Sequence, residues 1–303
     1  MRPRPGMVHA LLQAGMRAPS ADNRHTLRFA WRGDTQLVLS THAPSWAELP
    51  HRRLLAPMGY DAVLENLRLR SLEFGLALHE QLFPDPAEPH RIAELQWTAT
   101  SQSADPLSAH IEARHTNRRF YQRRRLTLAT LEHLNAAALR VPGTQLRWLD
   151  APAERRAVLR AIRLAETERF KQPELHRELF SAVRFDVGWK DSADVGLPPA
   201  ALEVEAPMRA PFAALRYWPV MRGMSWLGAQ AQGLALQPMA AATVLSVQQA
   251  VGGWVRPAVQ ARIRAALAVS DTYSYIPCRL FRLGRSSAPA VTARRNSPHL
   301  DAS

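Results

Sequence analysis

The sequence predicts a chain that contains both α-helices and β-strands, on the basis of two kinds of periodicity and a composition that supports a core. Of its 303 residues, 47% are hydrophobic and 21% are charged, which is enough apolar material for one large or two closely packed domains. Apolar residues recur at helical spacing over 7–17 and 60–81, whereas 27–30 and 36–40 have the pattern of a strand pair around a turn. Helices and paired strands are therefore expected in one chain.

The first half of the chain gives the clearest elements. The amphipathic helix at 7–17 ends at the Pro, Ser and Asn residues of APSADN, which break a helical pattern. After the strand pair, the helical pattern of 60–81 continues until just before Pro84. A strand is expected at 92–98. The order is therefore helix, strand, strand, helix, strand.

The middle of the chain predicts further elements. We expect one helix from Pro106 to about His115 and another over 126–138, with Thr127 as its N-cap. Residues 145–149 have the pattern of a strand. Residues 153–170 carry many Arg and Glu pairs and predict a long surface helix.

The last part of the chain is less regular. Residues 186–219 are rich in proline and predict an irregular lid or arm, and 277–283 predict a strand. The segment 74–84 (FGLALHEQLFP) is echoed at 232–240 (QGLALQPMA), and both share GLAL. This echo suggests two homologous lobes, because the separation is too long for a solenoid repeat. The alternative is that GLAL recurs by chance in a chain rich in Leu and Ala.

The charge of the chain bears on its partners. The net charge is +13 with a pI near 11.1, which suggests an anionic partner such as nucleic acid. Lys171 and Lys190 are the only lysines, and the arginines are spread along the whole chain instead of forming one patch. Because nucleic-acid binding needs clustered charge, that function is kept only as an alternative hypothesis.

Cysteine content and hydropathy indicate where the protein works. Cys278 is the only cysteine, so an intrachain disulfide is impossible and a cytoplasmic location is expected. Residues 223–255 contain no charged side chain and are long enough to cross a bilayer. Several glutamines and Pro238 interrupt this stretch, and amides are costly in hydrocarbon. We therefore expect a buried or cofactor-facing segment and no membrane partner.

Several familiar catalytic motifs are missing from the sequence. It contains no GxGxxG, and 228–233 (GAQAQG) lacks the Lys-Ser/Thr of a phosphate-binding loop. Residues 223–228 (GMSWLG) are one residue too long for a nucleophile elbow. His79-Glu80 begins an HExxH pattern that does not continue, and no metal site is expected. Hydrolase and metalloenzyme functions are therefore disfavoured.

Three polar segments remain as candidate sites. APSADN places Ser20 and Asn23 on a loop after a helix, either to meet a planar polar ligand or only to stop the helix. RHTNRRFYQRRR, 114–125, contains six arginines, which either hold an anion or are solvated. If the preceding helix continues, two guanidinium groups four residues apart would share one helix face. The third segment is a basic loop at 284–295.

In combination, these segments resemble the nitroreductase superfamily, and most closely its fused branch with two lobes in one chain. The resemblance is carried by APSADNRHTLRF at 18–29, NLRLRSLEFGLAL at 66–78, RHTNRRFY at 114–121, QAQGLALQPM at 230–239 and FRLGRSSAPAVTARR at 281–295. It implies an α+β nitroreductase fold that is normally a dimer with FMN at its interface. Here two lobes, 1–105 and 106–303, would form a monomeric pseudo-dimer, with the proline-rich arm at 186–219.

The resemblance also implies which residues hold the FMN phosphate. Arg114, Thr116 and Arg118 match the phosphate-holding Arg-Ser-Arg cluster of the family. Arg294 or Arg295 matches its C-terminal phosphate ligand. The arginines at 123–125 lie beyond this motif and are expected to be solvated.

The flavin ring is implied to meet Ser20 and Asn23, and here the sequence departs from the family. Where relatives continue with Gln-Pro-Trp, this chain has His25-Thr26-Leu27. Relatives also carry a strand and most of a helix before the second GLAL element, whereas this chain is shortened near Ala229. The second lobe is therefore expected to lack part of one wall of the site.

The expected function is that of an FMN-dependent oxidoreductase. Hydride from NADH or NADPH would pass through the flavin to a small-molecule nitro, quinone or enone acceptor, so no side chain needs to act as a nucleophile. The first alternative is a protein that binds and sequesters FMN without turnover and uses the arm as a cover. The second is a basic nucleic-acid-binding protein.

Overall fold

The structure is a computed structural model of the chain. It describes residues 4–24, 26–32, 36–41, 50–116, 118, 126–140, 148, 151–154, 156, 170–226 and 300–301. The chain divides into two compact units. Among the described residues, the first unit contains those up to His115 together with 300–301, and the second contains those from Thr116 to Trp226. Compact units are not by themselves homologous lobes, so the lobe ranges 1–105 and 106–303 stay predictions.

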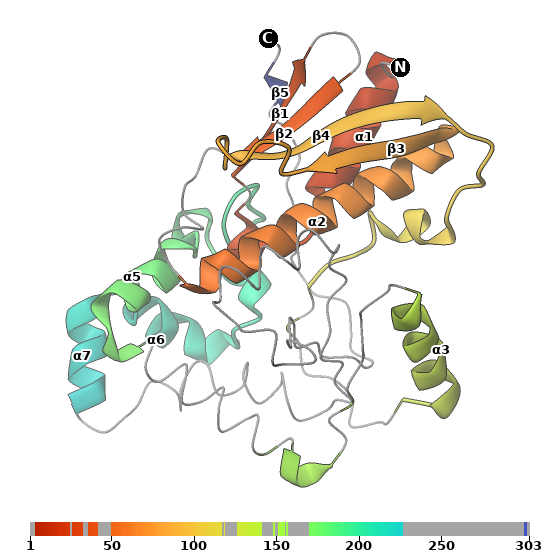
Figure 1. Cartoon of the computed structure of the whole chain (residues 1–303). Helices are drawn as coiled ribbons and strands as arrows, with labels where there is room; N and C mark the ends of the chain where they lie inside the picture. Colours follow the sequence, from red (N-terminus) through yellow and green to blue (C-terminus); the bar gives the residue numbers. More distant parts are fainter. Residues whose placement is uncertain are drawn as a thin grey trace. The chain divides into compact units, whose positions relative to one another are not determined.

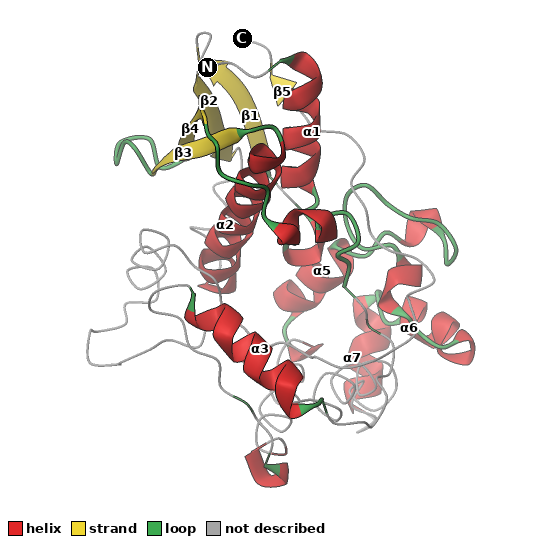
Figure 2. Ribbon diagram, turned by 90° about the vertical axis from the view of Figure 1, so that its right-hand side faces the viewer, coloured by secondary structure: helices red, strands yellow, loops and turns green. Residues whose placement is uncertain are grey.

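Five strands form one sheet in the first unit, in the order β3-β4-β2-β1-β5. The first four pair antiparallel, and the short β5 pairs parallel to β1 (Figure 1). Figure 2 shows that all the described strands belong to this sheet. The α+β class is confirmed by these strands together with the helices. The bounds of the strands are β1 Leu27–Arg32, β2 Gln36–Thr41, β3 Leu76–Leu82, β4 Arg91–Ala99 and β5 Leu300–Asp301.

Two helices complete the first unit. Helix α1, Pro5–Met16, begins with proline at its first position, where the missing N–H costs no helical hydrogen bond. Helix α2, Pro50–Glu73, has Pro57 inside it. The predicted helix at 7–17, the strand pair and the strand at 92–98 are all confirmed by α1, β1, β2 and β4.

The expectation that a helix would continue to residue 81 is wrong. Helix α2 ends at Glu73, and Gly75 follows with a φ of +66°, a conformation that glycine adopts without steric cost. The next residues form β3. In this strand Leu76 and Leu78 contact the core, whereas His79 and Gln81 are exposed. The same leucines fit a helical and a strand spacing, and the turn at Gly75 decides between them.

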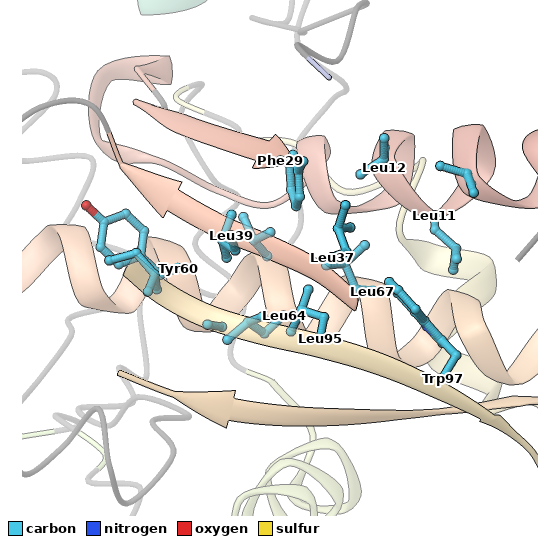
Figure 3. Packing of buried hydrophobic residues seen from close by; sticks show 14 of the residues in the cluster. Leu11, Leu12, Phe29, Leu37, Leu39, Tyr60, Leu64, Leu67, Leu95 and Trp97 are labelled. Carbon is cyan, nitrogen blue, oxygen red and sulfur yellow. The ribbon is translucent and has the colours of Figure 1, made fainter. Parts of the chain in front are cut away.

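One face of the sheet packs against α1 and α2 to form the core of the first unit. Figure 3 shows Leu11 and Leu12 of α1 and Leu64 and Leu67 of α2 beside side chains of the strands. The opposite face is polar, and there Arg32 and Gln36 bond the carboxylate of Glu94. The buried strand residues lie at alternate positions, as a one-sided sheet requires. The apolar ones that alternate are Phe29, Trp31, Leu37, Leu39, Leu76, Ala93, Leu95 and Trp97. The exception is Ile92, which is also buried and lies at the register shift between β2 and β4.

The described part of the second unit is mainly helical. Thr127 accepts a hydrogen bond from the backbone N–H of Thr130 at 3.3 Å and caps α3, which confirms the predicted cap. The bounds are α3 Leu128–Leu139, α5 Pro173–Ser181, α6 Arg209–Ala214 and α7 Trp218–Trp226, with short 3₁₀ turns at Phe185–Val187, Pro199–Leu202 and Ala206–Met208.

The segment 186–219 is irregular up to α6, as expected, with only short 3₁₀ turns, but its apolar side chains are packed. Leu197, Leu202 and Phe212 are buried in a cluster that also contains Phe180 of α5 and Met221 of α7. The prolines of this segment begin short helical turns instead of extending the chain. Burial of its apolar side chains therefore makes the segment part of a core of the second unit.

Several expectations concern residues outside the described ranges. The strands at 145–149 and 277–283, the helix over 153–170 and the second GLAL segment fall there wholly or for the most part. None of the described helices combines the length and the apolar character needed to span a bilayer. Most of the uncharged stretch 223–255 lies outside the described residues.

Candidate functional site

The loop that follows α1 has an unusual backbone. It contains a short 3₁₀ turn, Ala21–Asn23, in which Asp22 and Asn23 have φ values of +53° and +54°. Residues with a side chain adopt this left-handed conformation at a cost of about 1 kcal/mol or more, Asn and Asp most readily. The backbone N–H of Asn23 bonds the carbonyl of Ser20 at 3.4 Å, and both side chains are half-buried. Two of the predicted site residues therefore lie together on one shaped loop.

Helices α1 and α2 hold the start of this loop. The side-chain amide of Asn66 on α2 donates to the carbonyl of Ala14 on α1 at 2.9 Å. The carbonyl oxygen of Pro19 lies 3.8 Å from where a β-carbon on Gly59 would be, so the loop runs directly over α2. At the other end, the hydroxyls of Thr26 and Thr41 are 2.8 Å apart and connect the loop exit to β2.

Arg114 reaches the same place from the end of the first unit. Its Nε and Nη2 donate to the carbonyl oxygen of Arg17 at 3.3 and 3.0 Å. Arg17 is the C-cap residue of α1, three positions before Ser20. This contact joins two residues that are 97 positions apart in the sequence. The structure therefore brings Arg114 to the loop that carries Ser20 and Asn23.

The predicted helix that would carry Arg114 and Arg118 on one face is wrong. A 3₁₀ helix covers only Pro106–His110, and Arg114 to Thr116 are outside any helix. Ile111 explains the early end, because it is buried between Ala14 of α1 and Leu69 of α2. Packing of this side chain onto two helices overrides the local helical pattern.

Glu112 adds ion pairs beside Ile111. Its carboxylate accepts from Nε of Arg17 at 2.8 Å and from Nη2 of Arg70 at 3.5 Å. Residues 111–114, which we call the clasp, therefore contact α1 and α2 through an apolar side chain, a carboxylate and a guanidinium group. The ion pairs are partly exposed, so each contributes little energy alone, and the buried Ile111 is the main anchor.

The other predicted phosphate ligands belong to the second unit or lie outside the described residues. Arg118 is half-buried and donates from Nη1 to the carbonyl of Ala201 at 3.2 Å. Thr116 is exposed. Arg294 and Arg295 fall outside the described ranges, as does the shortened segment near Ala229.

Sequence reasoning missed Arg17, Glu112 and Arg70. Arg17 lies directly before APSADN, and Glu112 lies two positions before RHTNR, so both are just outside these two motifs. No spacing rule links residues 17, 70 and 112. Only the packing of Ile111 brings the three side chains together.

Two shifted pKa values belong to a pair in the second unit, Arg184 and Asp186, far from this loop in the sequence. The hydrogen bond from Arg184 lowers the pKa of the Asp186 carboxyl and raises the pKa of Arg184 itself. Both groups are exposed, and Nε and Nη2 of Arg184 lie 2.8 and 2.6 Å from the two carboxylate oxygens. This bidentate pair fixes a surface turn.

Chemically, the loop and the clasp can bind and orient a ligand. They offer a hydroxyl, an amide and guanidinium groups. Within those residues, no cluster of three or more His, Cys, Asp or Glu could hold a metal ion. No protein-family model matches the chain, and a search of curated proteins finds no significant match.

Proposed function

We propose that the chain is an FMN-dependent oxidoreductase of nitroreductase type. It would use NADH or NADPH to reduce a small-molecule nitro, quinone or enone acceptor. One observation carries the proposal: Arg114, the first residue of RHTNR, bonds the backbone at the start of the APSADN loop. Two of the segments that carry the resemblance to nitroreductases are thus in contact, as a shared site would require.

The residues present fit FMN. The half-buried Ser20 and Asn23 can donate and accept hydrogen bonds at the edge of a planar ring with alternating polar atoms. The phosphate needs charge-assisted donors, which Arg118, Arg294 or Arg295 can supply, with Thr116 as a hydroxyl donor. FMN, when bound, supplies two-electron chemistry by taking hydride from the nicotinamide and giving it to the acceptor.

The side chains of this protein would bind and orient rather than react. The left-handed backbone at Asp22 and Asn23 fixes the direction in which the loop presents its polar groups. Holding donor and acceptor in line is itself a large part of catalysis in such sites. If the flavin supplies the redox chemistry and the side chains only bind and orient, no nucleophile motif is needed, and the sequence contains none.

The pseudo-dimer is part of the same proposal. Two lobes in one chain would replace the two subunits of a nitroreductase, and the shortened segment near Ala229 would leave one ring face open to water. FMN affinity and turnover are then expected to be lower than in a two-lobe relative without that shortening, because a flavin ring needs a closed, pre-formed slot.

The purified protein gives a direct test. We expect a flavin absorption spectrum, release of FMN on denaturation, and oxidation of NADH or NADPH that depends on an added quinone. Flavin binding without any turnover would favour the sequestering alternative. A colourless protein that does not take up FMN would contradict both.

The phosphate ligands are tested by substitution. Arg118→Ala is expected to weaken FMN binding by about 1.5–3 kcal/mol, the range for hydrogen bonds to charged groups. Arg124→Ala, outside the motif, is expected to change it little. Equal losses for the two variants would indicate diffuse attraction by the positively charged chain instead of a phosphate site.

The nucleic-acid alternative gains no support from the best described segments. Residues 50–116 contain six Arg and nine Asp or Glu, and 170–226 contain seven of each sign. The excess positive charge therefore lies elsewhere in the sequence. Binding to single-stranded DNA that falls steeply with salt concentration would revive this alternative.

A further inference from the structure

We propose that Arg114 is a positioning residue, which sets the flavin-contacting loop 18–23 through the backbone of Arg17 and does not bind the FMN phosphate. The inference rests on the proposed function, because it concerns the same ligand. It departs from the resemblance to nitroreductases, which would make Arg114 a phosphate ligand together with Arg118.

The first reason is the hydrogen bonding of the guanidinium group. Arginine grips a phosphate with two parallel N–H groups on one edge of its planar fork. In Arg114, the edge formed by Nε and Nη2 is directed at the carbonyl oxygen of Arg17, with distances of 3.3 and 3.0 Å. Using this edge for a phosphate would release that carbonyl.

The second reason is electrostatic. Arg17 caps the C-terminal end of α1, where backbone carbonyls carry partial negative charge. A cation is favoured there and a phosphate is disfavoured. Arg114 therefore occupies a place that suits a guanidinium group and not its phosphate partner.

The third reason is that the clasp holds Arg114 in place. Ile111 is 4% exposed and packs against Ala14 and Leu69, and Glu112 bonds both Arg17 and Arg70. The backbone N–H of Arg114 also donates to the carbonyl of His110 at 3.0 Å. A side chain fixed at its base in this way can transmit a defined position to the carbonyl that it binds.

The loop needs such a constraint. Asp22 and Asn23 are both left-handed, and strained backbone persists only where its surroundings determine it. Arg17 is held twice, at its carbonyl by Arg114 and at its guanidinium group by Glu112. The entry to the loop is thereby fixed three residues before Ser20.

Comparing FMN with riboflavin, which has the ring but no phosphate, tests the inference in the full-length protein. For Arg114→Ala, we expect both affinities to fall by the same factor, about tenfold, because the ring-contacting loop is affected. Arg114→Lys should recover part of the loss for both ligands, since an ammonium group can still donate to the carbonyl. Arg118→Ala is the matched control and should weaken FMN alone. A loss confined to FMN in Arg114→Ala would overturn the inference.

Hydrogen exchange separates positioning from general destabilisation and from failure of the proposed function. In Arg114→Ala, amides of residues 18–24 should exchange faster, while those of β1 to β4 keep their protection. Unchanged exchange in 18–24, or faster exchange throughout the sheet, would overturn the inference. If the unaltered protein binds neither flavin, the proposed function fails, and this exchange measurement alone decides the role of Arg114.

Discussion

The two units build their cores by different means. In the first, leucines and two tryptophans from a one-sided sheet and two helices interlock, and the elements are long and regular. In the described part of the second, helices are short and aromatic rings fill the centre: Phe180, Phe185 and Phe212 lie with ring centroids 5.8 to 6.4 Å apart. The first core is therefore formed by regularly spaced side chains of long helices and strands, whereas the second is formed mainly by aromatic rings.

This difference explains where buried polar groups occur. In the first unit, Trp97 donates to the hydroxyl of Ser71 at 2.8 Å, which in turn donates to the carbonyl of Leu67 within α2. In the second unit, His176 lies between the rings of Phe180 and Trp218, and its Nε2 donates to the carbonyl of Leu215 at 2.7 Å. A short helix leaves carbonyls at its end that a side chain must satisfy, and α6 uses this histidine.

Removing one large ring from each core should give the largest effect. Trp97→Ala and Phe212→Ala are each expected to lower the free energy of unfolding by about 3–5 kcal/mol, through lost burial and a cavity. Hydrogen exchange should localise the first loss to the sheet and the second to α5 and α6. Leu128→Ala, at a side chain that is 70% exposed, serves as the control and should change little. Loss of protection in both units from either change would show that the cores are not separate.

The histidine of the second core should matter for its hydrogen bond. His176→Phe keeps a ring of similar size but leaves the Leu215 carbonyl without its donor, so we expect a loss of about 1–3 kcal/mol in chemical denaturation. His133→Phe, at an exposed position of α3, is the comparison. If His176→Phe leaves the free energy of unfolding unchanged, the hydrogen bond to Leu215 contributes nothing and the aromatic contacts alone stabilise this position.

Glycine-to-alanine substitutions at one turn in each unit are expected to differ in their cost to stability. Gly75→Ala in the first unit is expected to cost about 1 kcal/mol, because φ is +66° but the added carbon would meet only an oxygen at 3.6 Å. Gly196→Ala in the second unit should cost more. There φ is +83°, and the added carbon would lie 3.0 Å from the carbonyl oxygen of Ala182. Thermal unfolding of the two variants measures which one loses more stability. A larger loss of stability for Gly75→Ala would contradict this prediction.

The smallest expected effect concerns the exposed pair of Arg184 and Asp186. Its hydrogen bond lowers the pKa of the Asp186 carboxyl in the folded state, so the pair stabilises the fold above the ordinary carboxyl pKa. That contribution is lost as the pH falls through the lowered value. In an NMR titration, Arg184→Ala should shift the midpoint of Asp186 upward. An unchanged midpoint would show that the pair is not formed in solution.

The sequence predicted the fold best where one periodicity was dominant. Helix α1, the pairing of β1 with β2, and the Thr127 cap depend on local patterns, and all are confirmed. Strand β3 was missed because leucines at 76 and 78 fit both periods. The segment 186–219 was misjudged because its proline content is visible in the sequence, whereas the burial of Phe212 depends on distant rings.

The candidate site was predictable as separate segments but not as an arrangement. Loop residues Ser20 and Asn23 could be chosen by type, since hydroxyl and amide groups suit a polar ring. The contact of Arg114 with Arg17 depends on Ile111 packing across two helices, and no local rule contains that information. The roles of Arg294 and Arg295, which lie outside the described residues, stay predictions.

The place of β5 has a consequence for synthesis of the protein. Phe29 of β1 pairs with Leu300, a residue made almost a whole chain length later. While the ribosome is still translating the residues between them, β1 exposes an unpaired edge, which is a template for association with other nascent chains. The sheet of the first unit can therefore be completed only after residues 300–301 have been synthesised.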